Sequence, residues 1–169
     1  MTGVTLTIRL DDVAPRAAMA RLAAGAQDKT ELMDQIGSVL VNGARERIAQ
    51  TNVTPEGVPW PKSLRAQLSQ GVTLHDSGTL MNSITEEPSA DRVEVGSNMI
   101  YAGVHQSGAT ITAKSSGALH FTLANGEQVT VGSVTIPARP YLGVSEDEAA
   151  DIEDLATAFL GDLVSAGGN

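Results

Sequence analysis

Three consecutive residues, His75, Asp76 and Ser77, carry the side chains of a hydrolytic triad. A working triad needs its nucleophile, base and orienting carboxylate to converge on one reacting atom, which adjacent residues cannot do. The Gly-x-Ser-x-Gly pattern of a nucleophile elbow is also missing around Ser77. We therefore interpret Asp76 or Ser77 as the cap of a short helix that runs through Ile84, and we predict no catalytic residue.

The side chains that could bind a metal or a cofactor are few. The chain has no cysteine, which excludes disulfides and thiolate ligands, and its histidines, at positions 75, 105 and 120, have no helix-turn spacing. We interpret His105 as a half-buried, hydrogen-bonded residue that fixes the turn after its helix. Gly103 and Gly108 flank it without the Gly-Lys-Ser/Thr of a phosphate-binding loop, so neither a metal nor a cofactor is predicted.

Arg139 stands at a restricted place in the chain. It precedes Pro140, which favours an extended backbone and projects the guanidinium away from the chain. A guanidinium held in this way favours a carboxylate partner. The partner lies either in the same subunit or on a neighbouring subunit, for example on its acidic C-terminal helix, and the sequence leaves both alternatives open.

Acidic residues are concentrated at the C-terminal end. The net charge is −9, and seven acids follow Leu142 with no base among them, which leaves 13 of the 20 acids against 11 bases in the rest. A surface of this sign repels phosphates, so we predict that DNA can pass the protein without specific binding. Residues 146–154 are interpreted as a solvated helix face, or alternatively as the lining of a channel in a ring.

The N-terminal sequence predicts neither export nor membrane insertion. Residues 1–10 lack a basic region followed by an apolar stretch, and no run of about 18 apolar residues occurs anywhere. Assembly in the host cytoplasm is therefore the expectation.

Periodicity in the first half of the chain predicts a strand and two helices. Residues 4–10 alternate between apolar and polar types, as in a strand with one buried face. An Ala-rich stretch predicts a helix over 15–24, and helical spacing predicts a longer one over 28–50. The segment 51–73 is predicted to be irregular and held by Trp60, with a turn of helix near 63–68.

Two details are predicted for the long helix. Asp28 and Glu31 have the spacing of a capping box. Gly43 lies on its apolar face, which indicates the close approach of another backbone.

The second half is predicted to contain a hairpin and a final helix. Asn125 and Gly126 give the strongest hairpin signal. Ser145 and Glu148 form a second capping box, before a helix with one apolar face. The other predictions are a strand at 92–96, a helix at 101–106, an exposed loop at 107–117, and hairpin strands at 119–123 and 128–134.

The length and composition fit one domain spanning residues 1–169. A chain of this size buries roughly 70% of its unfolded surface. Aromatic residues make up 3% of it, so the core must be built mainly from aliphatic side chains. The predicted fold class is α+β, a mixed or antiparallel sheet packed against a long helix, with a C-terminal acidic helix.

Four short elements, in order, make the chain resemble the tailed-phage virion morphogenesis family, also called tail completion proteins. The first is Pro55, Gly57 and Trp60, and the second is Asp76, Gly78 and Leu80. The third is Tyr101, Ala102, His105, Gln106 and Gly108, and the fourth is Pro137, Ala138, Arg139 and Pro140. Where many relatives have a bulky residue after the His-Gln pair, this chain has Ser107.

The resemblance implies a non-enzymatic structural protein of the virion. It implies a homo-oligomeric ring, commonly sixfold, at the head–tail junction, with the head–tail connector and tail proteins as partners and no membrane. The residues implied to serve structure or assembly are Trp60, Asp76, Gly78, Tyr101, His105, Gln106, Gly108, Arg139 and Pro140. Contacts with neighbouring subunits are expected at 51–73, at 107–118 and at the edges of the 119–134 hairpin.

Three alternatives remain open from the sequence. One is a tail terminator ring that stops growth of the tail tube. Another is a phage-carried hydrolase using Asp76 or Glu86 with His75. The last is an acidic binding module that depends on residues 146–169.

Overall fold

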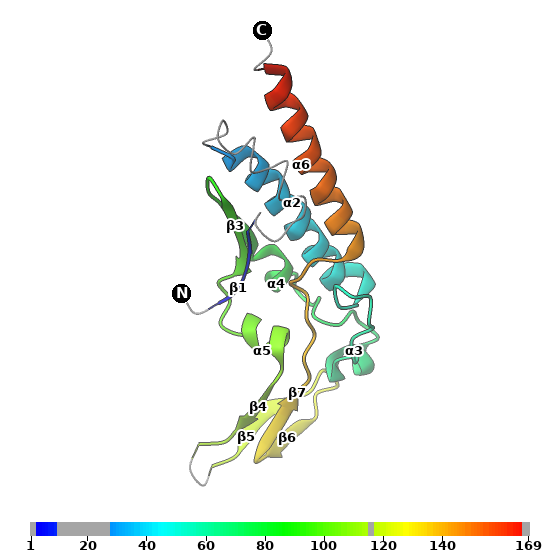
Figure 1. Ribbon diagram of the computed structural model, residues 1–169. Helices are drawn as coiled ribbons and strands as arrows, with labels where there is room; N and C mark the ends of the chain where they lie inside the picture. Colours follow the sequence, from blue (N-terminus) through cyan, green and yellow to red (C-terminus); the bar gives the residue numbers. More distant parts are fainter. Residues whose placement is uncertain (1–2, 10–27, 115–116, 167–169) are drawn as a thin grey trace.

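A computed structural model describes residues 3–9, 28–114 and 117–166, and it has the predicted α+β class (Figure 1). The helix predicted at 15–24 lies outside the described residues. The helices are α2 (Thr30–Glu46), a π-helical turn (Arg47–Thr51), α3 (Leu64–Ser69), α4 (Thr79–Asn82), α5 (Ala102–Ser107) and α6 (Glu146–Ala166). The strands are β1 (Val4–Arg9), β2 (Ile84–Pro88), β3 (Arg92–Ser97), β4 (Ala109–Thr112), β5 (Leu119–Thr122), β6 (Gln128–Val131) and β7 (Ser133–Ile136).

The body of the protein is an antiparallel sheet covered by α2. The strand order is β1-β3-β2, which confirms the strands predicted at 4–10 and 92–96. The apolar stripe of α2 is buried against Ile84, Val93 and Val95. A Cβ on Gly37 would lie 2.8 Å from a Val93 methyl, so this glycine lets the helix lie close to the sheet.

The prediction of a helix continuing through Ile84 was wrong. Only α4, four residues long, forms there, and Ile84 begins β2 with none of its surface exposed. The pairing of Ile84 with Ser97 on β3 shows why. Burial beside β3 overrides the low strand propensity of a segment that contains two glutamates and a proline.

The helix predicted at 28–50 is confirmed, but its N-terminal cap differs from the prediction. Lys29 occupies the N-cap position, and Asp28 accepts from the Thr30 amide at 2.9 Å without a reciprocal bond from Glu31, so the capping box is absent. At the other end, the π-helical turn extends the helix to Thr51. Asn52 ends it in the left-handed conformation, and its side-chain amide donates to the carbonyls of Arg47 and Ile48.

The acidic C-terminal helix, α6, forms as predicted and packs against α2 (Figure 1). Its capping box is present: the Ser145 amide donates to Glu148 at 2.6 Å, and the Glu148 amide donates to the Ser145 hydroxyl at 3.2 Å. Ile152 and Ala156 are buried, and Leu155 and Phe159 pack against the core.

Strands β4 to β7, within residues 109–114 and 117–136, form a projecting β-ribbon, which we call the arm; in Figure 1 it occupies the end of the molecule opposite to the C-terminus. The hairpin predicted at Asn125 and Gly126 is confirmed between β5 and β6. The loop predicted at 107–117 is partly a strand, because β4 pairs with β7. Between the two pairs, the Ala113 amide donates to the Gly132 carbonyl at 2.9 Å.

Candidate assembly site

Residues 137–143, which we call the strap, connect the arm to α6 and lie across the body of the protein (Figure 1). Pro137 and Pro140 have no N–H to donate to a sheet, so the segment continues neither β7 nor a helix. Its last part is buried all the same, with Tyr141 at 0% and Leu142 at 5% exposure. The polar backbone groups of such a segment must find partners outside regular secondary structure.

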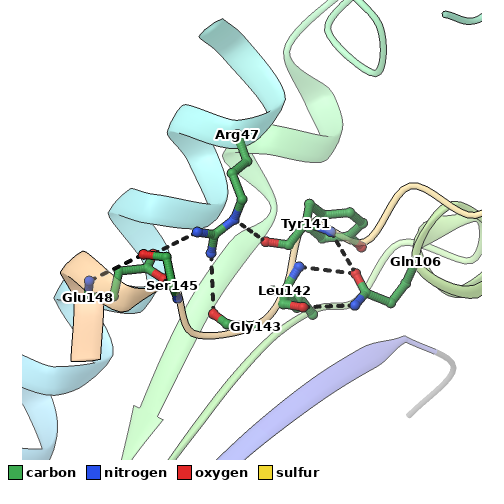
Figure 2. Close-up of polar contacts among 7 residues, drawn as sticks. All are labelled: Arg47, Gln106, Tyr141, Leu142, Gly143, Ser145 and Glu148. Carbon is green, nitrogen blue, oxygen red and sulfur yellow. Dashed lines mark hydrogen bonds and ion pairs between the residues drawn. The ribbon is translucent and has the colours of Figure 1, made fainter. Parts of the chain in front are cut away.

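Gln106 on α5 supplies several of these partners (Figure 2). Its Oε1 accepts the backbone N–H groups of Tyr141 and Leu142, both at 3.0 Å. Its Nε2 donates to the Leu142 carbonyl at 2.9 Å. A primary amide can both accept and donate in this way, whereas a carboxylate cannot donate.

The rest of α5 holds the strap at two further points. The backbone N–H of Arg139 donates to the His105 carbonyl at 2.7 Å, and the Tyr141 hydroxyl donates to the Ala102 carbonyl at 3.2 Å. Burial, with a smaller contribution from Tyr101, raises the pKa of Tyr141 and keeps this donor protonated. The third and fourth elements of the sequence resemblance are therefore in direct contact.

Gly108 makes this contact possible. Its φ of +73° lies in the region that side chains avoid, and a Cβ there would lie 2.7 Å from the Ala138 nitrogen. Only glycine lets the end of α5 pass so close to the strap.

Arg47 binds the strap from the side of the long helix (Figure 2). Its Nε donates to the Tyr141 carbonyl at 2.9 Å, and one terminal nitrogen donates to the Gly143 carbonyl at 3.3 Å. The other terminal nitrogen lies 2.9 Å from the Glu148 carboxylate, and both side chains are more than nine-tenths buried. One guanidinium, on the π-helical turn that continues α2, thus binds both the strap and α6.

The structure corrects the prediction for Gly43. The group that approaches it is the Glu148 carboxylate and not another backbone, since a Cβ on Gly43 would overlap that oxygen. Arg47 and Glu148 were not predicted as a pair. The available signal was a single arginine within an otherwise apolar helix stripe.

The first element of the resemblance contacts the strap as well. The Trp60 indole N–H donates to the Pro140 carbonyl at 3.1 Å, and the ring is 7% exposed. In return, Arg139 Nε donates to the Pro61 carbonyl at 2.8 Å. Trp60, Arg139 and Pro140 therefore join the irregular segment 51–63 to the strap.

Arg139 lacks the carboxylate partner in its own subunit that was one of two predicted alternatives. Its residue exposure is 4%, and no described carboxylate lies within ion-pair distance of it. The arginine that forms an ion pair with the acidic C-terminal helix is Arg47, through Glu148. Burial lowers the pKa of Arg139, as expected for a cation surrounded mainly by dipoles.

His105 is half-buried, as predicted. The prediction that its ring forms a hydrogen bond was wrong among the described residues. The ring packs edge-on against Tyr101 at a centroid distance of 5.9 Å, and its Nδ1 is buried without a partner among the described residues. Burial and, to a smaller extent, the Arg139 cation lower the pKa of His105. Its imidazole is therefore neutral near pH 7.

Asp76 and Gly78 lie apart from the strap. Together with Arg65, Tyr101 and His105 they border a hollow of about 270 Å³. Asp76 is largely exposed, 3.4 Å from Arg65, and it does not cap α4 as predicted. The N-cap is Gly78, with a φ of +79° and no side-chain bond.

The described residues show no convergent catalytic or metal-binding arrangement. The side chains of His75, Asp76 and Ser77 form no hydrogen bond with one another; Ser77 pairs instead with Thr79 at 2.7 Å. No three potential metal ligands cluster within residues 3–9, 28–114 and 117–166. In the same ranges no helix combines the length and hydropathy needed to cross a bilayer.

Comparison with known proteins gives two matches to this chain. The model of the phage virion morphogenesis family matches residues 10–161. The "Mu-like prophage FluMu G protein 2" of Haemophilus influenzae is 32% identical over 144 residues, which cover 85% of this chain and 87% of that protein. No solved structure gives a significant match.

Proposed function

We propose that this chain, which belongs to the phage virion morphogenesis family, is a non-enzymatic structural protein that forms a ring at the head–tail junction of a tailed-phage particle. Family membership supports a role in building the virion. The ring, its place in the particle, and the connector and tail proteins as partners are the proposed part.

The observation that carries the proposal is that side chains from the elements of the family resemblance, together with Arg47, converge on the strap and not on a reacting atom. Trp60, Gln106 and Arg47 all donate to or accept from backbone groups of the strap. Side chains fixed in this way hold a shape. A shape held by buried hydrogen bonds suits a protein whose task is contact with other proteins.

The charge distribution supports the passage of DNA through such a ring. The first turn of α6 carries Glu146 and Asp147 on the surface, and Glu56 and Asp151 border the same large groove. Acidic groups at this density repel phosphates, so DNA would meet no specific binding site there.

The alternative is a terminator ring that stops growth of the tail tube. It would occupy a different position in the particle, and the same folded subunit could serve in either ring. The hydrolase alternative has less support, because Glu86 bonds to Ser38 on α2 while Asp76 pairs with Arg65.

Imaging of particles assembled without this protein tests the proposal. Separate heads and tails would support the junction, and overlong tails would support the terminator. Normal particles in normal numbers would contradict both. Supplying the intact chain in trans should restore joined particles of normal length, and mass spectrometry of purified particles should detect the chain.

A further inference from the structure

Two arginines are buried to a similar degree in this protein, but their hydrogen bonding differs. Arg47 is 6% exposed and Arg139 is 4% exposed. All three side-chain nitrogens of Arg47 are bonded, one of them to the Glu148 carboxylate. In Arg139, Nε donates to the Pro61 carbonyl, whereas neither terminal nitrogen donates to any group of the described residues.

The terminal nitrogens of Arg139 are not sealed inside the protein. Among the described residues, fully enclosed side-chain nitrogens without a partner occur on Arg45 and His105, and not on Arg139. The small exposed part of Arg139 therefore includes its terminal nitrogens. A guanidinium carries five N–H donors, and four of them are on these two atoms. Arg139 thus presents a set of unused donors at the surface while most of its side chain is covered.

This guanidinium is held in place by its own subunit. The backbone N–H of Arg139 donates to the His105 carbonyl at 2.7 Å, and Nε donates to the Pro61 carbonyl at 2.8 Å. The following Pro140 restricts the backbone conformation of Arg139. A cation that is fixed before binding loses little conformational entropy when a partner arrives.

The isolated subunit does not compensate the charge of Arg139. Burial lowers the pKa of Arg139, and no carboxylate lies close enough to offset this effect among the described residues. Buried charges in proteins are normally paired, because their removal from water is costly. A buried cation without a counter-charge therefore indicates that the counter-charge comes from outside the subunit.

A carboxylate is the group that fits these donors best. A planar guanidinium binds a carboxylate or a phosphate through two parallel hydrogen bonds. The phosphates of DNA are disfavoured here, because the chain has a net charge of −9 and a single recessed cation cannot follow a phosphate backbone. Protein carboxylates are available on α6, where six acids are exposed and form no ion pair among the described residues: Glu146, Asp147, Asp151, Glu153, Asp154 and Asp162.

We propose that the terminal nitrogens of Arg139 bind a carboxylate of a neighbouring protein chain in the assembled particle. The inference rests on the proposed function, which gives the chain protein neighbours. The carboxylate comes either from α6 of a second copy or from another protein of the particle, and the experiments below distinguish these sources.

A matched pair of substitutions in the full chain tests the contact. Arg139→Met removes the buried cation, and Arg92→Met removes a cation from an exposed position on β3, so both variants lose the same charge. Each variant is supplied in trans to particles assembled without the protein. We expect Arg139→Met to lower the yield of joined particles by about tenfold or more, because the partner's carboxylate is left unpaired. Arg92→Met should leave the yield unchanged, since exposed ion pairs contribute little.

Self-association of the purified variants identifies the source of the carboxylate. If it comes from a second copy, Arg139→Met should raise the dissociation constant for self-association by about tenfold or more relative to Arg92→Met, measured by sedimentation. If it comes from another protein, the two variants should self-associate equally while only Arg139→Met fails to join particles. Equal behaviour of the two variants in both assays would overturn the proposal.

Two further measurements separate a binding role from a purely structural one. Removal of an uncompensated cation should leave the urea midpoint of the Arg139→Met chain unchanged or higher, whereas a structural role would lower the midpoint and the particle yield together. In the unchanged chain, the NMR signal of the Arg139 Nε–H should shift saturably with sodium acetate and not with sodium chloride at equal ionic strength. No such shift would show that a carboxylate cannot reach the terminal nitrogens.

The outcome is also distinct from that of the proposed function. Normal particles assembled without any copy of the chain would reject the role at the junction. An Arg139→Met chain that restores joined particles as well as the unchanged chain would reject the Arg139 contact and leave that role in place.

Discussion

The side-chain amide of Gln106 pairs with the backbone of Leu142 in both directions, accepting its N–H at 3.0 Å and donating to its carbonyl at 2.9 Å. One side chain thus replaces the neighbouring strand that this buried segment lacks. The consequence is that the Leu142 backbone, which is bonded to no strand, has both its N–H and its carbonyl satisfied by one side chain.

Gln106→Glu should therefore destabilise the protein. The substitution keeps the size of the side chain and its acceptors, but it removes the donor and places a carboxylate against the Leu142 carbonyl. We expect a loss of about 1–3 kcal/mol in the free energy of unfolding, measured by urea titration. Gln128→Glu on the exposed face of the arm is the control, and equal midpoints for the two variants would contradict the role of Gln106.

The Arg47 and Glu148 pair should show strong coupling. Glu148→Gln leaves a buried guanidinium without its counter-charge, which costs about 3–5 kcal/mol in comparable buried pairs. In a double-mutant cycle with Arg47→Met, the double variant should lose less stability than the sum of the single variants. Glu146→Gln, on the exposed first turn of α6, should change the unfolding free energy little. Additive losses would show that the two residues act independently.

Stability should fall on mild acidification because of His105. Its pKa in the folded protein lies below the usual 6.5, so between these two values the unfolded chain binds the proton more readily. The stability contributed by the neutral ring is complete above the usual pKa and is lost as the pH falls below it. Unfolding free energies measured from about pH 7.5 to about pH 5 should decline less steeply in His105→Gln than in the unchanged chain. An unchanged slope in His105→Gln would refute the assignment.

Substitution of two glycines with similar φ values can distinguish the cost of backbone strain from the cost of a steric clash. Gly57 and Gly108 have φ values of +81° and +73°, but a Cβ on Gly57 would meet nothing within 4 Å. Gly57→Ala should cost about 1 kcal/mol from backbone strain alone. Gly108→Ala adds the contact with the Ala138 nitrogen and should cost at least about 2 kcal/mol. Thermal or urea unfolding of both variants measures the two losses of unfolding free energy. Equal losses would mean that the strap moves away from the added Cβ without cost.

The sequence predicts most of the fold but not the partners within the site. The period-two pattern of the first strand, the Ser145 and Glu148 capping box, and the Asn125 and Gly126 hairpin all depend on local physics, and all three are present. The strand beginning at Ile84 was missed because its conformation depends on burial beside β3. Neighbours distant in sequence decide such segments.

The site was harder to predict because its acceptors are main-chain carbonyls. Arg139 was expected to pair with a carboxylate, yet it donates to Pro61, and Trp60 donates to Pro140. Every residue has a carbonyl, so residue types give no sign of which one will be used. The charged pair of Arg47 with Glu148 had a signal, since an arginine on an apolar stripe requires a buried counter-charge or dipoles.

The strap also determines how the molecule would carry a mechanical load. The arm and the far end of α6 lie at opposite ends of the molecule, and the strap is the covalent link between them. Because α5, the long helix and the Trp60 segment each hold it, tension applied at the arm would spread into the body as shear across several hydrogen bonds. A force applied to the arm by a neighbouring protein of the particle would thus be resisted by the core before the strap could be extended.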